Sequence, residues 1–214
     1  MSIEKLVNHP HIWQGAANHS LDRVHPTGFE ALDDHLPGGG WPAATLTEIV
    51  LEDYGIGELS LLMPALARLN RSDPEGGASG WILWVAPPFI PYAPALSKHG
   101  VDLTRLLFVH TAPNHHDSLW AVEQALRAGS CAAVLAWVQS ADETALRRLQ
   151  LAAEEGNCWA VLFRPEEALH QRSPAALRLR LLREDDVTRV EILKCRGGRP
   201  ATIRLCHRDR GDTG

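Results

Sequence analysis

The chain has 214 residues, 45% of them hydrophobic, and carries a formal net charge of −5. A chain of this length buries roughly 70–75% of the surface that its unfolded form exposes, which is enough for a single α/β domain. No apolar run approaches the roughly 20 residues that a membrane helix needs, and the N-terminus lacks the basic and apolar regions of an export signal. The composition therefore predicts a cytoplasmic protein with no membrane partner.

Charge is unevenly distributed along the chain. Residues 1–163 hold 9 Lys and Arg against 18 Asp and Glu, whereas residues 164–214 hold 12 against 8. A basic C-terminal region can meet nucleic acid or an acidic partner. The alternative is a solvated hairpin that carries arginines on its exposed face.

Residues 1–26 show no sustained hydrophobic period, and we interpret them as an N-terminal arm. The arm contains Ile12 and Trp13. An aromatic side chain on an arm must pack either on its own domain or on another chain. Residues 27–208 are predicted to form the core domain, and residues 209–214 are predicted to be a disordered tail.

The core domain begins with a predicted helix over residues 27–36, with Thr27 as its N-cap. Strand 44–50 then leads through a glycine-bearing turn into an amphipathic helix over residues 58–70. From residue 81 short apolar runs alternate with helical patterns, which predicts parallel strands buried on both faces, with helices on both sides of the sheet. The predicted strands are residues 81–86, 106–110, 132–138 and 159–163, and the predicted helices are residues 92–99, 118–128 and 142–155.

The pattern changes near residue 175. Three segments with a period of two follow one another, separated by turn residues, and they predict an antiparallel meander on the edge of the sheet. These segments are residues 175–183, 187–195 and 201–207. The predicted fold class is therefore α/β, with a central mostly parallel sheet, helices on both faces and a C-terminal antiparallel meander.

The turn between strand 44–50 and helix 58–70 stands where a phosphate-binding loop would lie. The nucleotide motif G-x-x-x-x-G-K-[ST] needs a lysine for the β- and γ-phosphates and a hydroxyl for Mg²⁺. Here Gly55 and Gly57 are present, but Glu58 and Leu59 follow Gly57 in place of the lysine and the hydroxyl residue. A carboxylate suits the helix dipole of an empty site, and it would repel a triphosphate.

Two carboxylates of such ATPases are also missing from their expected positions. Strand 132–138 ends in Trp137 and Val138 where these enzymes usually place Asp, and no carboxylate follows strand 81–86 in the place of the usual base. The residues that could substitute for the first are Gln139, Asp142 and Glu143. The four cysteines show no C-x-x-C spacing. The sequence therefore predicts a degenerate ATPase with no catalytic residues, no cofactor and no metal site.

Six short blocks carry a resemblance to a known family: residues 55–62 (GIGELSLL), 84–88 (WVAPP), 91–96 (PYAPAL), 100–103 (GVDL), 146–153 (LRRLQLAA) and 196–200 (RGGRP). In this order they resemble the bacterial ImuA family, which is related to the SulA cell-division inhibitors. A helix ending in LPGGG, followed by the strand TEIV, resembles the ATPase core of RecA. The resemblance covers nearly the whole chain and implies a RecA-like three-layer sandwich.

The resemblance also implies a function, which is a non-catalytic accessory role in translesion DNA synthesis during the SOS response to DNA damage. The implied partners are RecA, an ImuB-like protein related to polymerases, and an error-prone polymerase. Two alternatives stay open. One is a SulA-like inhibitor that binds the tubulin-like division protein, and the other is an unusual RecA-like ATPase.

Two surfaces are candidate partner-binding sites. RecA-class proteins pack an N-terminal arm on the core of a neighbour, so the resemblance implies that Ile12 and Trp13 dock on RecA or on a family partner. The basic C-terminal region is the second candidate, for the ImuB-like protein or for single-stranded DNA. Its arginines are Arg199, Arg204, Arg208 and Arg210.

Overall fold

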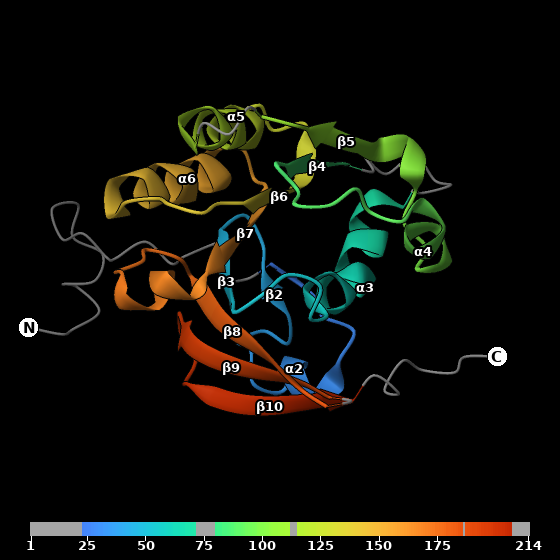
Figure 1. Ribbon diagram of the computed structural model, residues 1–214, viewed down its shortest axis with the longest axis vertical. Coiled ribbons are helices and arrows are strands. Elements are labelled where there is room, and N and C mark those ends of the chain that lie inside the picture. Colours follow the sequence, from blue (N-terminus) through green and yellow to red (C-terminus); the bar gives the residue numbers. More distant parts are fainter. Residues whose placement is uncertain (1–22, 72–79, 112–114, 186, 207–214) are drawn as a thin grey trace, which may run out of the picture.

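The computed structural model describes residues 23–71, 80–111, 115–185 and 187–206 (Figure 1). Its strands are β1 (Val24–His25), β2 (Trp41–Pro42), β3 (Leu46–Leu51), β4 (Trp81–Val85), β5 (Leu106–Val109), β6 (Cys131–Trp137), β7 (Trp159–Pro165), β8 (Leu177–Glu184), β9 (Val187–Cys195) and β10 (Ala201–Cys206). Its α-helices are α2 (Glu30–Asp33), α3 (Glu58–Asn70), α4 (Ala93–Lys98), α5 (His115–Arg127) and α6 (Glu143–Glu155). Short 3-10 helices lie at η1 (Leu103–Arg105) and η2 (Glu166–His170).

Within the described residues, eight strands form one sheet in the order β10-β9-β8-β3-β7-β6-β4-β5. The neighbours from β8 to β5 in this order are parallel, whereas β9 is antiparallel to both β8 and β10. The C-terminal meander (β8, β9 and β10) therefore extends the parallel sheet on one side, and β5 forms the opposite edge (Figure 1).

Helices cover both faces of the sheet. One face buries Ile49 of β3 and its alternating neighbours against Leu62 and Leu66 of α3. The other face buries Val134 of β6 and its neighbours under α5 and α6, where Leu146 lies in the same cluster (Figure 1). The predicted α/β fold, with a mostly parallel central sheet, helices on both faces and a C-terminal antiparallel meander, is confirmed.

A row of aromatic side chains crosses the sheet on the face that packs against α3. Phe163 of β7 stacks on Trp137 of β6 with ring centroids 4.6 Å apart, and Trp137 lies 5.5 Å from Trp84 of β4. Trp84 in turn lies 5.6 Å from Phe108 of β5. Trp137, which stands where ATPases usually carry a carboxylate, is thus a buried member of a packed aromatic row.

The first predicted helix is much shorter than expected. Its N-cap is Phe29 and not Thr27, and α2 covers only Glu30–Asp33. The hydroxyl of Thr27 accepts a hydrogen bond from the Phe29 N–H at 3.0 Å, while the Asp33 carboxylate accepts one from the Thr27 N–H at 2.9 Å. These side-chain hydrogen bonds satisfy a turn at residues 27–29, so the helix cannot begin at Thr27.

The structure describes only the end of the predicted arm. Val24 and His25, at the end of the predicted arm, pair with Pro42 and Trp41 and so join the domain. Residues 1–22 of the arm and the predicted tail (residues 209–214) lie outside the described residues. Throughout the ranges that the structure describes, every helix is too short or too polar to cross a membrane.

The prediction that the parallel strands are buried on both faces is wrong for β5. Leu107 and Phe108, which point to opposite faces of the sheet, are 44% and 40% exposed. The physical reason is position, since a strand at the edge of a sheet has a neighbour on one side only, and an apolar run does not show whether its strand is central or at the edge.

Candidate functional site

The loop between β3 and α3 is the one for which the sequence predicts a degenerate phosphate-binding loop. β3 is buried along its whole length, and α3 begins at Glu58 directly after the glycines. Gly55 has φ +84° and Gly57 has φ +112°, a left-handed conformation that glycine adopts without steric cost. The glycines therefore retain the backbone shape of an anion-binding loop at the N-terminus of a helix.

The Glu58 side chain occupies this loop. Its Oε1 accepts a hydrogen bond from the Gly55 N–H at 2.8 Å, and its Oε2 accepts one from the Gly57 N–H at 3.1 Å. Glu58 is only 4% exposed. The N–H groups that would face a phosphate are therefore bound to a carboxylate of the chain itself, which also lies favourably at the positive end of the α3 dipole.

Tyr54, in the same loop, contacts the segment that follows β6. Gln139, which follows β6, donates a hydrogen bond from its side-chain amide to the Tyr54 hydroxyl. Burial raises the pKa of Tyr54 above its ordinary value of 10, although the hydrogen bond from Gln139 acts in the opposite direction. Gln139 is thus engaged with the loop.

The remaining substitutes for the Mg²⁺ carboxylate do not converge on the loop. Asp142 is the N-cap of α6, and its Oδ1 accepts a hydrogen bond from the Ala145 N–H at 2.7 Å. Glu143 is the exposed first residue of α6. Among the residues that the structure describes, no group of three or more His, Cys, Asp and Glu side chains could hold a metal ion.

A buried ionic cluster on β3 was not predicted from the sequence. Glu48 is fully buried, and its Oε1 lies 3.0 Å from Nη1 of Arg164 on β7, while its Oε2 lies 3.3 Å from Nε of Arg178 on β8. The second Arg164 nitrogen, Nη2, donates to the Gln171 side chain at 2.8 Å. The cluster joins the central strand to both of its neighbours. The available signal was a single charged residue inside each of the apolar strands β3 and β7, since a buried charge needs a partner.

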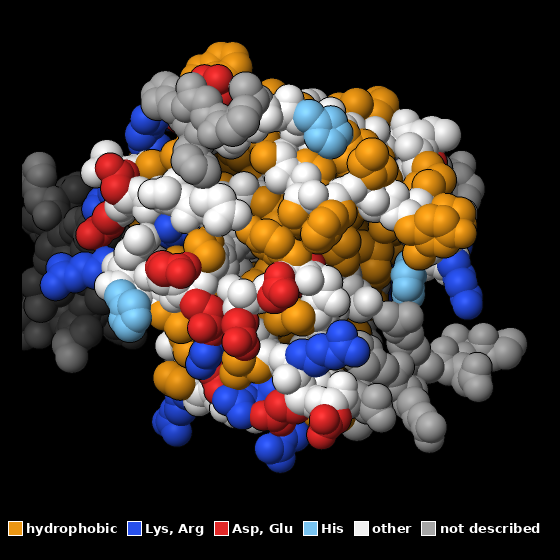
Figure 2. All heavy atoms as spheres, in the orientation of Figure 1, with side chains coloured by type: hydrophobic (Ala, Val, Ile, Leu, Met, Phe, Trp, Pro, Cys, Tyr) orange, Lys and Arg blue, Asp and Glu red, His pale blue; other side chains and the backbone are white. Residues whose placement is uncertain are grey.

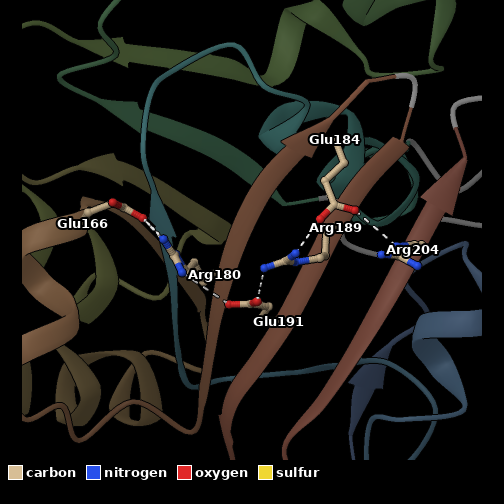
Figure 3. Close-up of polar contacts among 6 residues, drawn as sticks. All are labelled: Glu166, Arg180, Glu184, Arg189, Glu191 and Arg204. Carbon is tan, nitrogen blue, oxygen red and sulfur yellow. Dashed lines mark hydrogen bonds and ion pairs between the residues drawn. The ribbon is translucent and has the colours of Figure 1, made fainter.

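Several arginines of the basic C-terminal region are paired with carboxylates. Arg204 of β10 lies 3.2 Å from Glu184, and Arg189 hydrogen-bonds to the same carboxylate and holds its pKa below the ordinary value. Figure 3 shows these pairs as part of one chain of contacts that crosses the meander. Its members, in order, are Glu166, Arg180, Glu191, Arg189, Glu184 and Arg204.

The other predicted partner-binding residues fall into two groups. Arg199 is exposed in the turn between β9 and β10. Ile12, Trp13, Arg208 and Arg210 lie outside the described residues.

An exposed apolar surface lies at the β5 edge of the sheet, and the sequence did not reveal it. Phe89, Ile90 and Tyr92, in the segment between β4 and α4, are 70%, 87% and 74% exposed. With the exposed side chains of η1 and β5 they form what we call the β5 edge surface, which consists of Phe89, Ile90, Tyr92, Leu103, Leu107 and Phe108. In Figure 2 hydrophobic side chains gather over this part of the molecule, and acidic side chains lie on the surface below it in the same view.

A groove of about 300 Å³ belongs to this surface. Side chains of the β4–α4 segment, α4, η1 and β5 line it, among them Ile90, Pro91, Leu96, Leu103, Phe108 and His110. A larger groove of about 450 Å³ lies between α5 and α6, beside the exposed Trp120. Glu123, Asp142 and Arg148 are its charged lining residues, and Glu123 is paired with both Arg127 and Arg148. Of the two grooves, the first is the more apolar.

Comparison with known proteins gives the following matches. The family model described as Cell division inhibitor SulA matches residues 44–160. Protein ImuA from Caulobacter vibrioides (strain NA1000 / CB15N) is 32% identical to this chain, over 81% of this chain and 79% of that protein. Cell division inhibitor SulA from Edwardsiella piscicida is 33% identical over 51% of this chain and 61% of that protein. The crystal structure of SulA from Pseudomonas aeruginosa aligns with a TM-score of 0.46 and 26% sequence identity, over 58% of this chain and 99% of that one.

Proposed function

The chain belongs to the ImuA family and shares its central region with the SulA family, and from this membership we propose that it is a non-catalytic accessory protein of translesion DNA synthesis. In this role it acts in the cytoplasm during the SOS response. Its proposed partners are RecA, an ImuB-like protein and an error-prone polymerase, which it brings together through protein–protein contacts.

The hydrogen bonds of Glu58 are the observation that carries the non-catalytic part of the proposal. A nucleotide phosphate in this loop would have to displace a carboxylate that already binds the N–H groups of Gly55 and Gly57. If the carboxylate stayed, two like charges about 4 Å apart would repel each other by about 4 kcal/mol near a protein surface. The aromatic stacking of Trp137 in the Mg²⁺ carboxylate position supports the same proposal. Phosphoryl transfer depends on neutralising and positioning phosphate, so this loop is expected to support neither.

The proposed contact with RecA uses the N-terminal arm. Ile12 and Trp13 are the large apolar residues of this segment that we expect to dock on a partner's core. The experiment is a binding measurement between immobilised RecA and the full-length chain, with Trp13→Ala as the variant. Trp120→Ala is the matched control, because Trp120 is an exposed tryptophan on α5. Loss of RecA binding by Trp13→Ala alone is expected, and undiminished binding by a folded Trp13→Ala protein would contradict the proposed contact.

The C-terminal region is the second proposed contact. Arg199 is exposed, but Arg204 is paired with Glu184. The pairing favours a protein partner, such as the ImuB-like protein, over single-stranded DNA, because DNA binding needs arginines that are free to neutralise phosphates. DNA binding through Arg199, Arg204, Arg208 and Arg210 would weaken steeply between 50 and 200 mM salt. If single-stranded DNA binding is insensitive to salt, these arginines do not bind its phosphates, and the ImuB-like protein is the expected partner of this region.

The second candidate function is inhibition of cell division. The observation that favours it is the match of the SulA family model to residues 44–160, which includes both the β3–α3 loop and β5. In this role the chain would bind the tubulin-like division protein. Polymerisation of that protein, measured by light scattering with and without an equimolar amount of this chain, separates the two functions. Unchanged polymerisation together with RecA binding supports the accessory role, and the reverse result supports division inhibition.

A further inference from the structure

The segment between β4 and α4 holds its large apolar side chains away from the core in a fixed conformation. Ala86 has φ +51°, which is unfavourable for a residue with a Cβ atom, and its N–H donates to the Val109 carbonyl of β5 at 2.8 Å. Pro87, Pro88 and Pro91 restrict the backbone that follows. Phe89 and Ile90 are therefore presented to solvent by a stiff segment tied to β5, and this arrangement lowers the entropy cost of binding through them.

The backbone of β5 is open on its outer side. The Val109 carbonyl points toward β4, and the direction alternates along a strand, so the N–H and C=O groups of Leu106 and Phe108 point away from β4. No other described strand pairs with this side of β5. Natural edge strands are usually protected by charge, proline or a bulge, and the sequence LLFV of β5 has none of these. The aromatic row of the sheet also ends here at the partly exposed Phe108.

We infer that a second copy of this chain covers the β5 edge surface, in a symmetric dimer whose two β5 strands pair antiparallel. The surface is self-complementary, because it contains both protruding side chains and a groove. The two-fold axis would place the carboxyl end of one β5, beside Ile90, next to the amino end of the other β5, beside Leu103. The protruding Ile90 of each copy then lies against the groove of the other, and the two sheets become continuous.

The size and charge of the surface fit this occupant. Since an aromatic side chain offers about 150–250 Å² of contact area, the six exposed side chains offer on the order of 600–800 Å² per copy, close to the roughly 800 Å² per partner of a standard interface. With Leu107 opposite Leu107 of the second copy, Arg105 lies opposite Val109. Asp102 lies 3.7 Å from Arg105 and offsets its charge, so the contact carries little net repulsion.

The test is the molar mass of the full-length chain, measured by light scattering after size exclusion and by sedimentation equilibrium. The wild type is expected to be a dimer that dissociates only on dilution. Ile90→Asp and Leu107→Asp are each expected to weaken dimerisation at least tenfold, because each places a charge in the apolar contact. Leu151→Asp is the matched control, since Leu151 is 53% exposed on α6, away from β5, and this variant should remain dimeric. Thermal unfolding at a concentration where the wild type is monomeric would show that all variants are folded, because dimerisation itself raises the midpoint.

A cysteine variant tests the antiparallel pairing of the two β5 strands independently. Leu107→Cys is expected to form a cross-link between the two copies under mild oxidation, whereas Leu151→Cys should not. A wild type that is monomeric at 100 µM overturns the inference. A dimer that both aspartate variants leave intact overturns it as well, because the contact would then lie on another surface. The inference does not depend on the proposed function, and RecA binding by a monomeric variant would leave that function standing.

Discussion

The loop at Glu58 and the β5 edge surface belong to the same sheet, but they differ in whether their potential binding groups are already satisfied by the chain itself. At the loop, two backbone N–H groups that could bind a ligand are satisfied by a buried carboxylate of the chain itself. At the β5 edge, large apolar side chains and a strand edge remain uncovered by the described residues. We therefore expect a partner to bind at the edge of the sheet, and we expect no nucleotide to bind at the loop of Glu58.

Among the substitutions considered, those at Glu58 are expected to change the free energy of unfolding most. Glu58→Ala leaves the N–H groups of Gly55 and Gly57 without their acceptor and removes a charge from the α3 N-terminus, so we expect the free energy of unfolding to fall by about 1–3 kcal/mol. Glu58→Gln keeps one acceptor oxygen and should lose less. Urea denaturation measures both, and Glu143→Ala, at the exposed start of α6, is the control, with an expected change within about 0.5 kcal/mol. If Glu58→Ala is no less stable than this control, the carboxylate does not hold the loop.

Tyr54 offers a smaller, pH-dependent test of the closed loop. Because burial raises the pKa of Tyr54 in the folded state, the folded protein holds the phenolic proton more tightly than the unfolded chain does. Its contribution to stability is therefore complete below pH 10 and is lost as the pH rises through the folded-state pKa. We expect Tyr54→Phe to flatten the alkaline fall of the free energy of unfolding. Identical alkaline slopes for wild type and Tyr54→Phe would show that Tyr54 is not buried in the loop.

The smallest expected effect on stability lies at the β5 edge. Ile90→Ser removes a side chain that is almost fully exposed in the single chain, so the free energy of unfolding at protein concentrations where the chain is monomeric should stay within about 0.5 kcal/mol of the wild type. Chemical denaturation at low concentration measures this change. A loss as large as that of Glu58→Ala would mean that Ile90 packs in the fold of its own domain, and the comparison between the two regions would fail.

Local sequence patterns predicted the strands and the antiparallel edge of the sheet, but not that β5 forms the opposite edge. The apolar runs at residues 81–86, 132–138 and 159–163 correspond to β4, β6 and β7, because a strand buried on both faces needs apolar residues at successive positions. The run at residues 106–110 has the same pattern, but its strand lies at the edge. The order of strands comes from contacts between distant segments, so the pattern within one strand does not contain it.

The sequence predicted which residues occupy the candidate site, but it did not predict the contacts that they make. The absence of lysine after Gly57 is visible in the sequence, but the backward turn of the Glu58 carboxylate onto Gly55 and Gly57 depends on two left-handed glycines. The ionic cluster of Glu48 joins residues more than a hundred positions apart, which no local period reveals. The sequence also could not show that Arg204 is paired with Glu184 across the meander.

Calorimetric titration of magnesium and ATP into the wild-type protein measures whether the loop between β3 and α3, which is filled by the Glu58 carboxylate, binds nucleotide. We predict no saturable heat at protein concentrations of tens of micromolar and ATP concentrations up to the millimolar range. A one-to-one binding isotherm with magnesium-dependent affinity would contradict this account, because the nucleotide would then have displaced the Glu58 carboxylate from Gly55 and Gly57.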